Sequence, residues 1–154
     1  MYNHAPEGYV CPFCLVAQGL DGEGVLTRQQ DIVYRDRLLT AFIASHFWDN
    51  NKGHVIIIPN EHFENIYDLP DELGASIHSL ARRVALALKE CYGCEGTSTR
   101  QHNEPGANQE VLHYHLHVFP RYHNDNLYLT QRRATTPEER LPYAMKVRHA
   151  LEGV

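Results

Sequence analysis

The stretch that decides the fold is Val111–Pro120, which reads VLHYHLHVFP. Histidines occupy every second position, at His113, His115 and His117, with apolar or aromatic residues between them. Strict alternation over this length is typical of a β-strand, whose successive side chains point to opposite faces. The pattern therefore predicts a strand over 111–119 with three imidazoles on one face and a core on the other. Such a face favours metal binding, or nucleophilic and acid–base chemistry near neutral pH.

The composition is that of an ordinary globular chain. The 154 residues suit a single domain over 1–154, with 43% hydrophobic and 21% charged residues. A net charge of −5 argues against non-specific binding to long nucleic acid. No apolar run approaches the roughly 20 residues of a membrane span, and the N-terminus lacks the pattern of a signal peptide. We therefore expect a cytoplasmic protein that does not bind membranes.

Four further strands are predicted from short apolar and β-branched runs. They fall at 31–34, 38–45, 54–59 and 95–101. The last of them is joined to the histidine strand by the polar turn 102–109, which makes a hairpin.

Two helices are also expected. The long one begins near Pro70, carries apolar residues at three- and four-residue spacing, and ends at Gly93. The second begins at the capping box Thr136–Glu139 and runs to about Leu151, with Pro142 expected to disturb its first turns.

The pair in Cys11-Pro-Phe-Cys14 is open to three interpretations: a redox dithiol, metal ligands or incidental cysteines. A redox motif is expected after a strand and before a helix, and nothing upstream resembles that strand. As metal ligands the two thiols supply only half of a four-coordinate site, so they need partners elsewhere in the chain.

Several of these motifs occur together in one known family. The histidine stretch matches the pattern His-φ-His-φ-His-φ-φ, where φ is apolar, and Gly53-His54-Val-Ile-Ile-Ile-Pro59 matches a Gly-His strand. With the cysteine pair near the start, the chain resembles the histidine triad (HIT) superfamily of nucleotide hydrolases and transferases over roughly Tyr9–Tyr122. Pro120-Arg121-Tyr122 continues as in the branch that acts on dinucleoside polyphosphates.

The resemblance implies an α+β fold with a five-stranded antiparallel sheet and one long helix, to which the capping box adds a C-terminal helix. The family core would cover about 9–122 and a C-terminal extension 123–154. It also implies a homodimer whose sheets continue across the interface. The long helix and the strand Glu95–Gln101 would contribute to that interface.

The resemblance also assigns chemistry to two histidines. His115 would attack the α-phosphorus of a nucleotide and form a nucleotidyl-histidine intermediate, which water then resolves. His117 would lie beside the phosphate and help to protonate the leaving atom. Phosphate oxygens would be held by backbone amides together with Asn103 and Gln109.

The remaining binding positions include two departures from the family pattern. His46 stands where members carry the Asp or Asn that binds the ribose, and Glu110 stands where many have Ser or Thr. The resemblance places the base against three apolar side chains: Phe13, Val16 and Phe47.

A structural zinc ion is the cofactor that the resemblance implies. Its ligands would be the four side chains Cys11, Cys14, His54 and His113. A Cys2His2 set suits a closed tetrahedral site, which would tie the N-terminal segment to the ends of two strands.

The sequence thus predicts an enzyme that hydrolyses dinucleoside polyphosphates or nucleoside phosphoramidates, with a small nucleotide as its partner. Two alternatives remain open. In one, all three triad histidines hold a catalytic zinc ion in a hydrolase. In the other, the protein is a non-catalytic sensor or adaptor that binds AMP without turnover.

Overall fold

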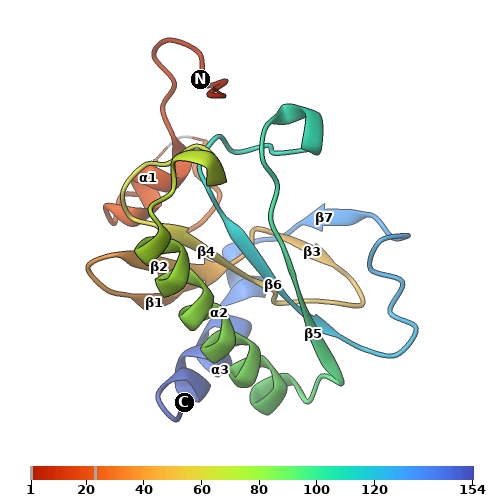
Figure 1. The fold of residues 1–154 in the computed structure, drawn as a ribbon. Helices are drawn as coiled ribbons and strands as arrows, with labels where there is room; N and C mark the ends of the chain where they lie inside the picture. Colours follow the sequence, from red (N-terminus) through yellow and green to blue (C-terminus); the bar gives the residue numbers. More distant parts are fainter. Residues whose placement is uncertain (1, 23) are drawn as a thin grey trace.

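The architecture is a central antiparallel sheet with two helices on one face, seen in a computed structural model that describes residues 2–22 and 24–154 (Figure 1). Five strands lie in the order β1-β2-β4-β6-β5. Their bounds are Ile32–Arg35 for β1, Leu39–Ile43 for β2, Val55–Pro59 for β4, Gly96–Arg100 for β5 and Leu116–Arg121 for β6. The predicted α+β fold with a five-stranded antiparallel sheet is therefore confirmed.

The histidine stretch differs from its prediction. Its strand β6 begins at Leu116 rather than at residue 111, and pairing with β4 ends at the Ile57–Leu116 pair. The preceding residues leave the ladder because their backbone groups bond elsewhere: the His113 N–H donates to the Val111 carbonyl at 2.8 Å, and the Tyr114 N–H to the Phe63 carbonyl. Only His117 of the three histidines lies within the strand.

A second, two-stranded sheet was missed. It pairs β3, His46–Trp48, with β7, Arg132–Ala134, in an antiparallel register. Neither of these strands is among those that the sequence predicts. Strands of three residues are too short for alternation to be recognised.

The helices are α1, Pro12–Ala17, α2, Asp71–Tyr92, and α3, Pro137–Leu151. Single 3-10 turns cover Gln29–Asp31, Ile66–Asp68 and Pro105–Ala107. None of the helices in the described ranges has the length and apolar character needed to cross a bilayer. Pro142 lies inside an unbroken α3, so the expected disturbance of its first turns is wrong.

The sheet has two differently covered faces. The longer helices α2 and α3 pack on one face and form the main core with alternate residues of the central strands, such as Ile43, Val55 and Ile57. The opposite face carries Phe42 and Ile56. This face is covered only in part, by the short helix α1. Because β4 is buried on both sides, it reads as a continuous apolar run. The partly covered face is where a ligand site can form.

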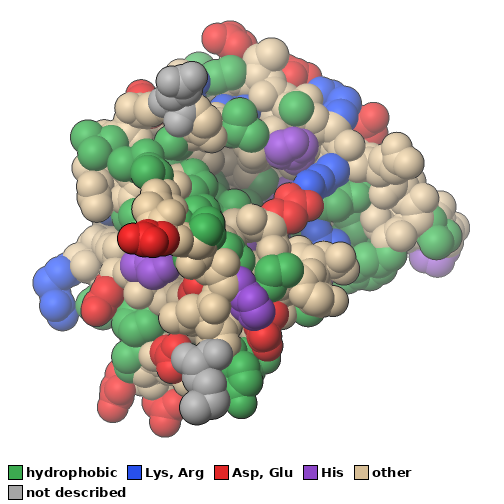
Figure 2. All heavy atoms as spheres, turned by 90° about the horizontal axis from the view of Figure 1, so that it is seen from above, with side chains coloured by type: hydrophobic (Ala, Val, Ile, Leu, Met, Phe, Trp, Pro, Cys, Tyr) green, Lys and Arg blue, Asp and Glu red, His purple; other side chains and the backbone are tan. Residues whose placement is uncertain are grey.

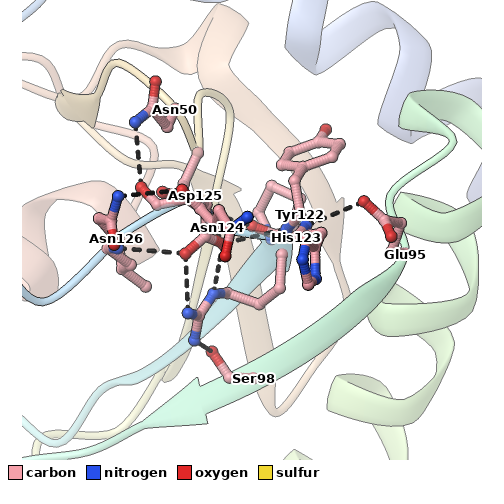
Figure 3. Close-up of polar contacts among 12 residues, drawn as sticks. Asn50, Glu95, Ser98, Tyr122, His123, Asn124, Asp125 and Asn126 are labelled. Carbon is pink, nitrogen blue, oxygen red and sulfur yellow. Dashed lines mark hydrogen bonds and ion pairs between the residues drawn. The ribbon is translucent and has the colours of Figure 1, made fainter.

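The loop that follows β6 is fixed by the buried carboxylate of Asp125 (Figure 3). Arg121 donates to it from Nε at 2.7 Å and from Nη2 at 2.8 Å, and Asn51 donates at 2.7 Å. The Tyr122 and Leu127 backbone amides donate to the same carboxylate. These hydrogen bonds, that from Arg121 first, hold the pKa of Asp125 well below its usual range. The loop is thereby anchored at one carboxylate before the chain reaches β7.

Replacing this carboxylate should cost stability in a pH-dependent way. Asp125→Asn should lower the free energy of unfolding at pH 7 by about 1–3 kcal/mol. A depressed folded-state pKa stabilises the protein above the unfolded value near 3.9, so the deficit should shrink as the pH falls below about 4. Urea unfolding from pH 3 to 7 measures it. Asp49→Asn, at an exposed ion pair, is the matched control, and an equal deficit at pH 3 and pH 7 would contradict this role of Asp125.

Candidate active site

A cavity of about 630 Å³ opens on the partly covered face of the sheet. Figure 2 shows a hollow bordered by hydrophobic side chains on one side and by histidine, cationic and acidic side chains on the other. Phe13, Val16 and Phe42 contribute to the apolar lining. The lining includes eight side chains that carry or can carry charge: His46, His54, Arg100, His102, Glu110, His115, His117 and Arg132. This volume and this mixture of walls are typical of small-molecule sites, which occupy roughly 300–1,000 Å³.

His115 is held in one tautomer. Its Nδ1 lies 2.7 Å from the His113 carbonyl oxygen, so Nδ1 carries the proton and donates it in a hydrogen bond. The lone pair is then on Nε2, which has no hydrogen-bond partner among the described residues, and the side chain lines the cavity. Burial lowers the pKa of His115. The ring is therefore a neutral imidazole, the nucleophilic form.

His117 is paired with His54. The His117 Nδ1 and His54 Nε2 atoms lie 3.2 Å apart. Burial lowers the pKa of His54 to about 3 and that of His117 well below its usual value, so both rings are neutral. The His54 Nδ1 is buried without a partner in the described chain. A buried acceptor is tolerated better than a buried donor without a partner, which favours a proton on His54 Nε2 and leaves the His117 proton on Nε2.

The place of His54 depends on the glycine before it. Gly53 has φ +77°, and a Cβ there would collide with the Tyr92 hydroxyl from α2 and the Tyr143 ring from α3. The Tyr92 hydroxyl donates to the Gly53 carbonyl at 3.1 Å. His54 itself stacks on Phe119 at a centroid separation of 4.3 Å. Glycine alone combines an easy positive φ with the absence of a Cβ. Gly53 therefore allows the His54 ring to lie where it supports His117.

His113 belongs to a different cluster, with Cys11, Cys14 and His62. Its Nδ1 lies 3.3 Å from the Cys11 Sγ and 3.6 Å from the Cys14 Sγ, and the His62 Nδ1 lies 3.3 Å from the Cys14 Sγ. All four ligand atoms lie within 4.8 Å of one another. Bonds of about 2.0–2.3 Å to one tetrahedral zinc ion would give separations of this size, so the four side chains fit a metal ion.

The other nitrogen of His113 supports that fit. Its Nε2 lies 2.9 Å from the Pro59 carbonyl oxygen, to which it donates. The lone pair is then on Nδ1, towards the two cysteines. A second hydrogen bond of this kind is the usual support for a histidine that binds a metal.

The prediction of His54 as a metal ligand is corrected to His62. In the antiparallel pairing of β4 with β6, Val55 lies opposite Val118, so His54 is at the Phe119 end. His113 is at the other end, beside Pro59. Five residues of extended chain, about 16 Å, separate these ends. His62, just beyond β4, therefore completes the cluster.

Three other predicted contacts lie away from the cavity. Phe47 points into the main core against Tyr143, because alternation along β3 turns His46 and Trp48 to the cavity instead. The Asn103 Oδ1 accepts from the Ile66 N–H at 2.8 Å. Gln109 is buried, where it donates to the Glu64 carbonyl and accepts from the Glu104 N–H. Asn103 and Gln109 thus hold the turn together in this structure.

The structure adds cavity residues that the sequence did not indicate: Trp48, Arg100, His102, Asn108 and Arg132. Arg132 pairs with Glu110, with Nη2 2.6 Å and 2.7 Å from the two carboxylate oxygens. That hydrogen bond lowers the pKa of Glu110. The position of Arg100 could be predicted from the hairpin, because its register sets Arg100 opposite His117. Arg132 gave no signal because it comes from the missed strand β7.

Fold and cavity together describe a protein of the histidine triad type, and the sequence comparisons agree. The HIT domain matches residues 26–124, which is more than half of the chain. The chain belongs to the HIT family.

The relatives and solved structures carry different amounts of information. The chain is 36% identical over 90 residues to the "Protein hit" of Bacillus subtilis, covering 58% of this chain and 61% of that one. It is 36% identical over 70 residues to the adenosine 5'-monophosphoramidase HNT1 of Saccharomyces cerevisiae, covering 46% and 42%. A zinc-bound histidine triad family protein from Mycobacterium smegmatis superposes with a TM-score of 0.76 at 25% identity, covering 93% and 94%.

Proposed function

We propose that the protein is a nucleotide phosphohydrolase or nucleotidyl transferase in which His115 is the nucleophile. The observation that carries this proposal is the 2.7 Å hydrogen bond from His115 Nδ1–H to the His113 carbonyl. It directs the lone pair of Nε2 at the cavity. The activities named for relatives in the family, such as the yeast phosphoramidase, agree in kind.

The reaction has two balanced steps. In the first, a bond forms between His115 Nε2 and the α-phosphorus while the bond to the leaving group breaks. The leaving group departs with the electron pair, accepts a hydrogen bond from His117 Nε2–H and takes its proton from solvent water, so that His117 stays neutral. In the second, water attacks the phosphorus and the Nε2–P bond breaks. The products are a nucleoside monophosphate and a neutral His115, and the proton released by the attacking water replaces the one that the leaving group took from solvent.

The two walls of the cavity divide the substrate. The apolar lining at Phe13 and Val16 suits a nucleobase, and His46 lies where it can reach a ribose hydroxyl. The Glu110 carboxylate lines the cavity as a partner of Arg132, and this ion pair reduces its repulsion of a phosphate. Asn103 and Gln109 act through the turn that they hold.

The two alternatives fare differently. A catalytic zinc held by all three triad histidines is disfavoured, because His113 directs Nδ1 at the cysteines and uses Nε2 for Pro59. A sensor that binds AMP without turnover shares the whole cavity with the enzyme. It differs in forming no covalent intermediate, which makes that intermediate the decisive measurement.

Removing the nucleophile gives the first test. His115→Ala should lower turnover of diadenosine polyphosphates and adenosine phosphoramidates by several orders of magnitude, with nucleotide still bound. Acid-labile nucleotide trapped on the wild type should map to His115 by peptide mass spectrometry. His117→Ala is the control: it should still form the labelled intermediate, and its turnover should fall most for substrates with poor leaving groups. A label elsewhere, or no label and no turnover of any substrate, would refute the proposal.

We also propose a structural zinc ion at Cys11, Cys14, His62 and His113. It would join the start of α1 to the segment after β4 and to a residue three positions before β6. The described residues hold no other group of three or more potential ligands at this spacing. The zinc-bound relative from M. smegmatis agrees with a metal in the family.

Metal analysis distinguishes His62 from His54 as the fourth zinc ligand. Protein purified without chelator should contain about one zinc per chain. His62→Ala and Cys14→Ser should each lower the zinc content and the melting temperature. His54→Ala is the matched control, because it removes a histidine outside the cluster and should leave the zinc content unchanged. The assignment fails if His54→Ala loses the metal and His62→Ala keeps it.

We propose, finally, that two chains form a homodimer through β5 and α2. In the described chain β5 is an edge strand whose outer side has no neighbouring strand, and such edges are rarely left open. Leu86 on α2 is exposed to 48%. Light scattering on a gel-filtration column should report twice the mass of one chain. A single species of one-chain mass at micromolar concentration would rule the dimer out.

A further inference from the structure

Arg100 is the last residue of β5 and lies directly opposite His117 on β6. Cross-strand partners of this kind have Cβ atoms about 4.5–5.5 Å apart and point to the same face. Both side chains accordingly line the cavity. The guanidinium therefore lies in the site beside His117, the residue that contacts the leaving group in the proposed mechanism.

The guanidinium is held by aromatic rings rather than by a carboxylate. Its central carbon lies 5.0 Å from the Trp48 ring centroid and 4.9 Å from that of Phe119. Within the described residues, none of its nitrogens makes a hydrogen bond or an ion pair, and Nε is buried. Rings fix the plane of the group but do not satisfy its N–H donors. Arg100 is thus oriented, partly desolvated and without an anion.

The other cation of the cavity differs in this respect. Arg132 meets both oxygens of Glu110, so its charge is neutralised. Apart from the histidines, Arg100, Arg132 and Glu110 are the charged residues of the described lining. The cavity therefore holds one positive charge without a partner, and it lies next to His117. Burial lowers the pKa of Arg100, yet a guanidinium stays charged at neutral pH. Such a group is stabilised when an anion arrives.

We propose that Arg100 binds a phosphate of the leaving group, so that the preferred substrates are nucleotides whose α-phosphate is joined to a further phosphate. This proposal rests on the proposed function and narrows its substrate class. When the α-phosphorus is transferred to His115, the electron pair of the broken bond remains on the departing phosphate. Arg100 stabilises that charge while His117 Nε2–H donates a hydrogen bond to the leaving oxygen. An uncharged amine leaving group gains nothing from the guanidinium.

A comparison of two substrates tests the proposal by catalysis. Arg100→Gln should lower kcat/KM for diadenosine triphosphate relative to kcat/KM for adenosine 5'-phosphoramidate by about tenfold to a hundredfold. Arg100→Lys, which keeps the charge but loses the fork of donors, should recover part of that ratio. Arg37→Gln, at an exposed turn, is the matched control and should leave the ratio at the wild-type value. An unchanged ratio in Arg100→Gln would overturn the proposal, as would an equal fall for both substrates, which would place Arg100 on the α-phosphate.

A binding measurement keeps this test separate from the proposed function. In a His115→Ala background, calorimetry should show ADP binding about tenfold or more tightly than AMP, because ADP carries the additional phosphate. Adding Arg100→Gln should abolish that difference. If the wild type turns over neither substrate, the proposed function fails while this binding result still decides the role of Arg100. Equal affinity for ADP and AMP with Arg100 present would refute the proposal.

Discussion

The antiparallel pairing of β4 with β6 is the constraint on which the rest of the structure depends. It sets Val55 opposite Val118 and Ile57 opposite Leu116. His54 therefore lies at the end of the pair where His117 needs a hydrogen-bond partner, and Pro59 lies at the end where His113 needs one. One register thus assigns the histidines to two tasks. His113 joins the cysteine cluster, and His115 and His117 line the cavity.

Much of this could be predicted from the sequence where a long pattern existed. The β-branched run of β4, the apolar spacing of α2 and the capping box of α3 each indicated the element that formed. The histidine alternation identified the family but extended the strand too far. Residues 112–115 alternate in sequence, yet the His113 and Tyr114 N–H groups donate to the Val111 and Phe63 carbonyls instead of to a neighbouring strand. Alternation reports side-chain spacing and does not report which backbone partner is available.

The site was less predictable, because its composition depends on tertiary proximity. His62 lies in an irregular segment and joins the cluster only through the fold. The resemblance places Phe47 against the base, but alternation along β3, a strand that the sequence does not predict, turns its ring into the main core. Arg100 needed only the hairpin register, whereas Arg132 comes from a three-residue strand. The role of the ion pair between Arg132 and Glu110, which leaves Arg100 as the cation without a partner, is visible only in the folded chain.

The central claim is that His113 is committed to the metal cluster, so that His115 and His117 are left for the substrate. X-ray absorption at the zinc edge tests it most directly, on protein purified without chelator. The account predicts two sulfur ligands at about 2.3 Å and two imidazole nitrogens at about 2.0–2.1 Å. A shell of three imidazole nitrogens with no sulfur, or protein that binds no zinc, would contradict the account.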